Sequence, residues 1–197
     1  MFAVTHDTLF SPLPNRCGSK PIGHSITHFV HVKLPHASLL GMIDTPADQR
    51  LHFLSAIWRI GIGSITLTAV IIPGLKMAAY IVAKFSQRRM ITDTRGRSIP
   101  LITFRTQHAP VFHALAQSAV LEALFKSLQP YFANVDTQRT EGNRLEIRNG
   151  LSTVFKVLAV RLWRDTNQIL IDRCGAQGLF EHNQLIPSEV RAILQMR

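Results

Sequence analysis

Hydrophobic and polar residues alternate over one short stretch near the start of the chain. In residues 25–33, SITHFVHVK, alternate positions from Ile26 to Val32 share one face, which is typical of a β-strand. The preceding residues 1–23 are rich in Pro, Gly, Ser and Asn and are predicted to be irregular. Because a single strand is not stable without neighbours, we expect the remnant of a sheet whose other strands are absent or come from another chain.

Three longer segments have helical periodicity. The very apolar residues 48–89 form the first, and residues 106–132 are predicted to form the second. The polar stretch 134–144, NVDTQRTEGNR, is predicted to connect it to a third helix over residues 145–173. One stripe of the third helix has i, i+3, i+4 spacing and is predicted to face the core, namely Ile147, Leu151, Val154, Phe155, Leu158, Leu162 and Trp163.

These elements predict a mainly α fold, a long-helix bundle over residues 48–186. Residues 1–47 are predicted to be the remnant of a β domain with its linker, and residues 187–197 a divergent tail with one short helix. The stretch 92–100, TDTRGRSIP, is predicted to be a loop between the first two helices.

A transmembrane helix is an alternative interpretation of the first helical segment. Residues 60–75 carry no charge, and MAAYIVA continues the apolar run after Lys76, so a span over residues 60–83 is long enough. Lys76 lies well inside that stretch, Pro73 interrupts it, and Ser and Thr residues dilute it. A buried bundle helix is therefore favoured over a span.

Composition and net charge indicate which classes of binding partner to expect. The chain is 46% hydrophobic, enough to bury a core, and its net charge of +10 indicates an anionic partner such as nucleic acid, a membrane surface or a phosphorylated small molecule. The cations are dispersed and accompany no nucleic-acid-binding motif, so we expect no nucleic acid. Cys17 and Cys174 are predicted to be reduced thiols of an intracellular protein, and no signal peptide or peroxisomal C-terminal signal is recognised.

Four segments, taken in order, resemble one enzyme family. They are HFVHVKLPHASLL (28–40), GLKMAAYIVAKFSQRRM (74–90), PLITFRTQHAPVFHALAQSAV (100–120) and IDRCGAQGLFEHNQL (171–185). Together they resemble the C-terminal portion of the acyl-CoA oxidase and acyl-CoA dehydrogenase superfamily, and the oxidase branch is the most similar. In the last segment CGAQG stands for the family's C-G-[GA]-x-G turn.

The resemblance implies FAD-dependent α,β-dehydrogenation of an acyl-CoA thioester, in fatty-acid β-oxidation or on a secondary-metabolite side chain. It places the chain in the peroxisome or cytoplasm and implies a flavin site shared across a dimer interface. By the same resemblance, Arg89 reaches the FAD pyrophosphate of the partner subunit and Gln107 lies near the same cofactor. The turn that packs on FAD corresponds to Asp172, Gly175, Ala176, Gln177 and Gly178.

Other interpretations of these residues stay open. Arg89 at a helix C-terminus can complement the helix dipole, and Gly175 and Gly178 can be a helix cap and a turn. The chain ends before the position of the family's general base, so we expect a truncated homologue and predict no catalytic residue and no metal ligand. The alternative function is a non-catalytic oligomerisation module that pairs with itself or with a full-length paralogue, and a small membrane protein is less favoured.

Overall fold

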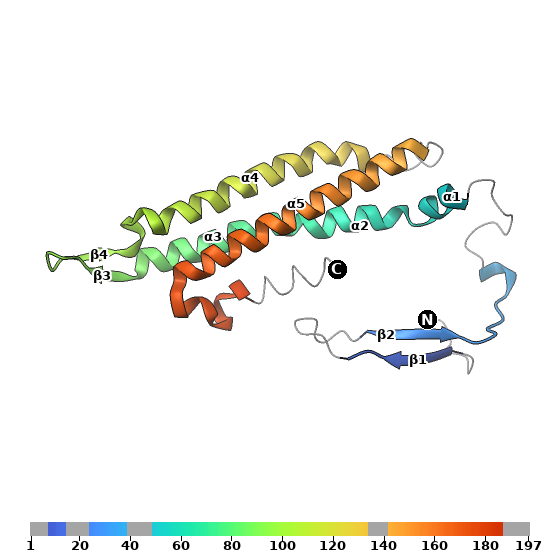
Figure 1. Cartoon of the computed structure of the whole chain (residues 1–197), viewed down its shortest axis with the longest axis horizontal. Helices are drawn as coiled ribbons and strands as arrows, with labels where there is room; N and C mark the ends of the chain where they lie inside the picture. Colours follow the sequence, from blue (N-terminus) through green and yellow to red (C-terminus); the bar gives the residue numbers. More distant parts are fainter. Residues whose placement is uncertain (1–7, 15–23, 39–48, 134–141, 187–197) are drawn as a thin grey trace. The chain divides into compact units, whose positions relative to one another are not determined.

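A computed structural model describes residues 8–14, 24–38, 49–133 and 142–186 (Figure 1). The chain divides into two compact units, Met1–Gln49 and Arg50–Arg197, next to the predicted boundary after residue 47. The described part is mostly helical, which confirms the predicted mainly α class. The predicted tail over residues 187–197 and Cys17 lie outside the described residues.

The described part of the N-terminal unit is a two-stranded antiparallel hairpin followed by a short 3₁₀ turn, η1 (His36–Ser38). Strand β1 (Thr8–Pro12) pairs with β2 (Ser25–Phe29), with Thr8 opposite Phe29. The prediction of a lone strand is therefore wrong, because its partner lies inside the segment that was predicted to be irregular. β2 also ends earlier than expected, at Phe29, two residues before His31, which has a left-handed φ of 51°.

The described residues from Gln49 onward form five α-helices. They are α1 (Gln49–Ala56), α2 (Trp58–Ala69), α3 (Ile71–Arg88), α4 (Arg105–Ala133) and α5 (Gly142–Cys174). The second and third predicted helices are confirmed as α4 and α5, although α5 begins inside the stretch that was predicted to be a connector. α2 and α3 follow one another along one rod, and this rod lies beside α4 and α5 in a bundle of three (Figure 1).

The first predicted helix is in fact three helices, and Pro73 explains the break at Val70. Pro73 stands in the first turn of α3 and has no N–H to donate to the Ala69 carbonyl, so α2 ends at Ala69. At the break, the Val70 N–H donates to the Leu67 carbonyl, three residues earlier, at 3.3 Å. The chain turns there and α3 starts one residue later.

A short β-hairpin joins α3 to α4, where a loop was predicted. β3 (Met90–Thr92) pairs antiparallel with β4 (Ser98–Pro100), with Ile91 opposite Ile99. Strands of three residues are too short to produce a recognisable alternation in the sequence. A 3₁₀ turn, η2 (Leu101–Thr103), leads from the hairpin into α4.

The core lies between α3, α4 and α5, with Leu75, Val82, Leu121, Phe155 and Trp163 almost fully buried. The predicted core stripe of α5 is only partly right. Two of its residues are buried and two half-buried, whereas Ile147, Val154 and Leu158 are exposed. The buried face of α5 is instead made by Phe155, Ala159, Trp163, Thr166 and Leu170.

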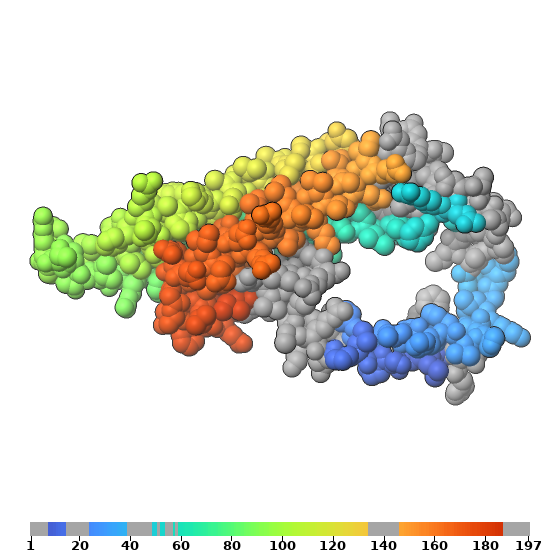
Figure 2. Space-filling view, in the orientation of Figure 1, coloured from blue at the N-terminus to red at the C-terminus, as the bar shows by residue number. Residues whose placement is uncertain are grey.

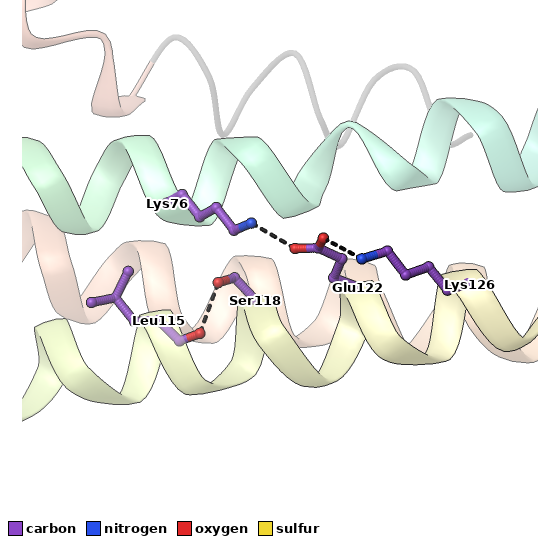
Figure 3. Close-up of polar contacts among 5 residues, drawn as sticks. All are labelled: Lys76, Leu115, Ser118, Glu122 and Lys126. Atoms are coloured by element: carbon purple, nitrogen blue, oxygen red, sulfur yellow. Dashed lines mark hydrogen bonds and ion pairs between the residues drawn. The ribbon is translucent and has the colours of Figure 1, made fainter.

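An ion-pair cluster joins α3 to α4 on the surface (Figure 3). The Glu122 carboxylate accepts hydrogen bonds from Lys76 Nζ at 2.6 Å and Lys126 Nζ at 2.9 Å. These two ammonium groups, Lys76 first, lower the pKa of Glu122 from 4.5 to about 2. One turn away, the Ser118 hydroxyl donates to the Leu115 carbonyl of its own helix.

The segment Arg59–Arg88, which comprises α2 and α3, is long and apolar enough to cross a membrane. In the structure 44% of its most apolar window is buried. The buried side of this segment, which includes Ile65, Ile72, Leu75 and Ala79, belongs to the core. Its apolar residues are thus partly used within the bundle.

Candidate functional site

A groove of about 640 Å³ lies along α3, opposite the segment that follows α5. That segment consists of two 3₁₀ turns, η4 (Gly175–Leu179) and η5 (Glu181–Asn183). α3 supplies an apolar floor whose members recur every three or four residues and so share one helix face. They are Met77, Tyr80, Ile81 and Phe85.

Cations line the same wall farther along α3. Lys84, Arg88 and Arg89 all reach the groove, and the described residues that line it include no Asp or Glu. Lys84 Nζ also lies 5.8 Å from the centre of the Tyr80 ring. Positive groups beside an apolar floor strengthen the attraction for an anion, because charges interact more strongly where the local dielectric constant is low.

Arg89 is held in place by its backbone. It is the C-cap of α3 with an extended conformation, φ −76° and ψ 112°. Its N–H donates to the Phe85 carbonyl at 2.9 Å, and its carbonyl accepts from the Leu101 N–H at 2.8 Å. With both backbone groups bonded, the direction in which the side chain leaves the helix end is fixed.

The turn after α5 approaches Arg89. A second hollow of about 410 Å³ adjoins the groove and is lined by Phe85, Arg89, Cys174, Ala176 and Gln177. The structure therefore brings together three of the residues that were predicted to bind a cofactor, Arg89, Ala176 and Gln177, although Arg89 is far from the other two in the sequence.

The two glycines of this turn have structural reasons of their own. Gly175 follows the end of α5 with a left-handed φ of 56°, which is the usual conformation of a glycine helix cap. A Cβ at Gly178 would lie 2.6 Å from the Ile171 carbonyl oxygen, so any side chain there would collide with the backbone of α5. Neither glycine lines the groove.

Cys174 lines the groove and the adjoining hollow but is not suited to act as a nucleophile. Its side chain is buried, and burial raises the pKa of the thiol to about 11. The neutral thiol is the only form populated near neutral pH, and a thiol is a weak nucleophile compared with its thiolate.

Gln107 does not line the groove. Its amide nitrogen donates to the Ser86 hydroxyl at 2.8 Å and to the Arg173 carbonyl at 2.7 Å, and the side chain is 5% exposed. Gln107 thus joins α4 to the ends of α3 and α5, which frame the groove.

The Arg173 side chain donates a hydrogen bond to the first turn of α4. Pro110 has no N–H for the Thr106 carbonyl four residues earlier, and Arg173 Nη1 donates to that carbonyl at 3.3 Å. The two contacts of Arg173 with α4, through its carbonyl and through its guanidinium, form what we call the α4–α5 clasp. Asp172, the remaining predicted site residue, is exposed and accepts a hydrogen bond from Gln168 at 3.2 Å.

Lys84, Arg88 and the apolar floor were not predicted as site residues. The signal was available, because Met77, Tyr80, Lys84 and Arg88 follow one another at helical spacing and change from apolar to cationic along one face. The sequence alone does not say that this face looks onto a groove, since that depends on where η4 and η5 fold.

Comparisons with known protein families, with curated proteins and with solved structures gave no match for this chain. Within the described residues, no group of three or more His, Cys, Asp or Glu side chains could hold a metal ion. The groove is thus the feature on which a function is argued below.

Proposed function

We propose that the helical unit binds the nucleotide half of FAD, as the C-terminal domain of acyl-CoA oxidases and dehydrogenases does. One observation carries the proposal. Arg89 and the Ala176–Gln177 turn, which the resemblance assigns to the cofactor, line a common hollow next to a cationic groove. The expected geometry could have failed, because these residues are far apart in the sequence.

The chemistry of the groove suits an adenosine diphosphate moiety. A guanidinium forks onto phosphate oxygens and keeps its charge at all physiological pH values, so Arg88 and Arg89 fit a pyrophosphate. The apolar floor around Tyr80 and Phe85 offers surfaces against which a flat adenine packs. A volume of about 640 Å³ falls within the usual range for small-molecule sites.

A bound flavin would supply hydride-accepting chemistry toward an acyl-CoA thioester, and the chain's own residues would hold and orient its nucleotide end. The remaining enclosure, and the residue that removes a proton from the substrate, would come from a full-length paralogue. We assign no catalytic residue to the described part of this chain.

Binding of FAD, ADP and FMN to the full chain tests the proposal by calorimetry. We expect FAD and ADP to bind and FMN, which lacks the adenosine diphosphate half, to bind far more weakly. Arg89→Gln removes a charge-assisted hydrogen bond of about 1.5–3 kcal/mol, so FAD affinity should fall about tenfold or more. Arg161→Gln, on an exposed position of α5, is the matched control and should leave affinity unchanged.

Two results would overturn the proposal. One is the absence of FAD and ADP binding both with the chain alone and after co-expression with a full-length relative. The other is an equal loss of affinity in Arg89→Gln and Arg161→Gln, because binding would then depend on total charge alone.

A second candidate, a helical oligomerisation module, is favoured by the outer face of α4. Phe112, Leu115 and Val120 are 63%, 42% and 63% exposed, and residues 106–121 contain no Lys, Arg, Asp or Glu. Light scattering should then show an oligomer that Val120→Glu dissociates and that the control Val157→Glu, on α5, leaves intact. A wild-type chain that stays monomeric at all concentrations would rule this candidate out.

A further inference from the structure

The β3–β4 hairpin projects from one end of the helical bundle, beyond the end of α3 and the start of α4 (Figures 1 and 2). Arginines surround it. Arg88 and Arg89 precede β3, Arg95 and Arg97 stand in the turn, and Arg105 opens α4. All five are exposed.

The single carboxylate of residues 88–105 belongs to Asp93, and the turn itself uses it. It accepts hydrogen bonds from the Arg95 N–H at 2.8 Å and the Arg97 N–H at 2.9 Å, and Arg97 Nε donates to it at 3.0 Å. The Arg97 backbone bond is the main reason why the pKa of Asp93 is lowered. Gly96, with φ 78°, completes the turn. The carboxylate is thus occupied and forms an ion pair with Arg97 at 3.0 Å, although the Arg97 side chain is 66% exposed.

Apolar side chains accompany these cations. Met90, the first residue of β3, is 47% exposed, and Phe104, between η2 and α4, is 39% exposed. Surfaces that bind nucleic acid are strongly polar, whereas a bilayer interface takes both kinds of group. Cations there contact lipid phosphates, and apolar side chains enter the boundary between headgroups and acyl chains.

We propose that the hairpin patch, made of Arg88, Arg89, Met90, Arg95, Arg97, Phe104 and Arg105, docks on an anionic phospholipid surface. The Asp93-centred turn holds Arg95 and Arg97 at the tip of the hairpin, and Arg88, Arg89 and Arg105 lie at the helix ends from which the hairpin projects, so several cations are available to lipid phosphates. This docking is peripheral and needs no helix to cross the bilayer. It is also independent of the flavin proposal, apart from Arg88 and Arg89, which border both surfaces.

Sedimentation with phosphatidylcholine vesicles, with and without phosphatidylserine, tests the proposal on the full chain. The wild type should bind only vesicles that contain phosphatidylserine, and added salt should weaken the binding. The double variant Arg95→Gln/Arg105→Gln removes two cations outside the groove and should weaken vesicle binding about thirtyfold. Its circular dichroism and FAD affinity should match those of the wild type.

A charge-matched control, Arg161→Gln/Arg164→Gln on the exposed side of α5, should retain vesicle binding. Equal losses in the two double variants, or equal binding to neutral and anionic vesicles, would overturn the proposal. Tighter binding to duplex DNA or RNA than to anionic vesicles, lost in Arg95→Gln/Arg105→Gln, would also overturn it and assign the patch to nucleic acid.

Discussion

Replacing Gln107 by Met separates a structural role of this residue from contact with a ligand. Met keeps the length of the side chain and removes both hydrogen bonds of the amide nitrogen. The Arg173 carbonyl lies in the last turn of α5, where no later helical N–H replaces the lost donor, and an unpaired buried acceptor costs about 1–3 kcal/mol. Loss of the bond to Ser86 adds about 0.5–1.5 kcal/mol. We therefore expect the free energy of unfolding to fall by about 2–4 kcal/mol.

Urea unfolding of the ligand-free chain, followed by circular dichroism, measures this loss. With a slope of about 2 kcal/mol per M, the midpoint should drop by about 1–2 M. Gln129→Met is the control, because Gln129 is exposed on the same helix, and it should change the free energy by less than about 0.5 kcal/mol. If Gln107→Met unfolds at the same urea concentration as the wild type while binding FAD less tightly, Gln107 is a ligand-contacting residue and the structural reasoning fails.

Two further predictions concern backbone space and charge. Gly178→Ala should lower the free energy of unfolding by about 1–3 kcal/mol, because the new methyl group meets the Ile171 carbonyl. Gly150→Ala has open space inside α5 and should raise that free energy by up to about 1 kcal/mol in the same urea assay. Equal effects of the two substitutions would contradict the close approach of Gly178 to Ile171. The lowered pKa of Glu122 means that its ion pairs act above pH 4.5 and are lost as the pH falls toward about 2. In Lys76→Met, carboxyl NMR titration should show the Glu122 pKa move back toward 4.5, and an unchanged pKa would show that Lys76 is not its main partner.

Hydrophobic periodicity predicted α4 and α5 well because each is long and bounded by polar or glycine-containing stretches. It failed for the β1–β2 pairing, since the partner of β2 lies in a Pro- and Gly-rich segment whose five-residue strand is defined by pairing and not by composition. It also misplaced the buried face of α5. Val154 and Leu158 are as apolar as Phe155, and only the positions of the neighbouring helices decide which side is covered.

For the candidate site, the sequence supplied Arg89 and the turn through a resemblance, and the structure placed them at one hollow. The sequence could not show that the Gln107 amide nitrogen donates its hydrogen bonds to the Ser86 hydroxyl and the Arg173 carbonyl. That depends on three helix ends meeting, which local patterns do not encode. The glycines were recognised as unusual, yet the reason for Gly178 is a carbonyl of the preceding helix and becomes visible only in three dimensions.

The α4–α5 clasp has a consequence for synthesis on the ribosome. Pro110 leaves the Thr106 carbonyl without its ordinary helical donor, and the replacement donor is 67 residues later in the chain. While the protein is being made, the first turn of α4 emerges from the exit tunnel long before Arg173 exists, so that turn must remain hydrated until α5 is nearly complete. The hydrogen bond between Arg173 and the Thr106 carbonyl can therefore form only after the end of α5 has left the tunnel.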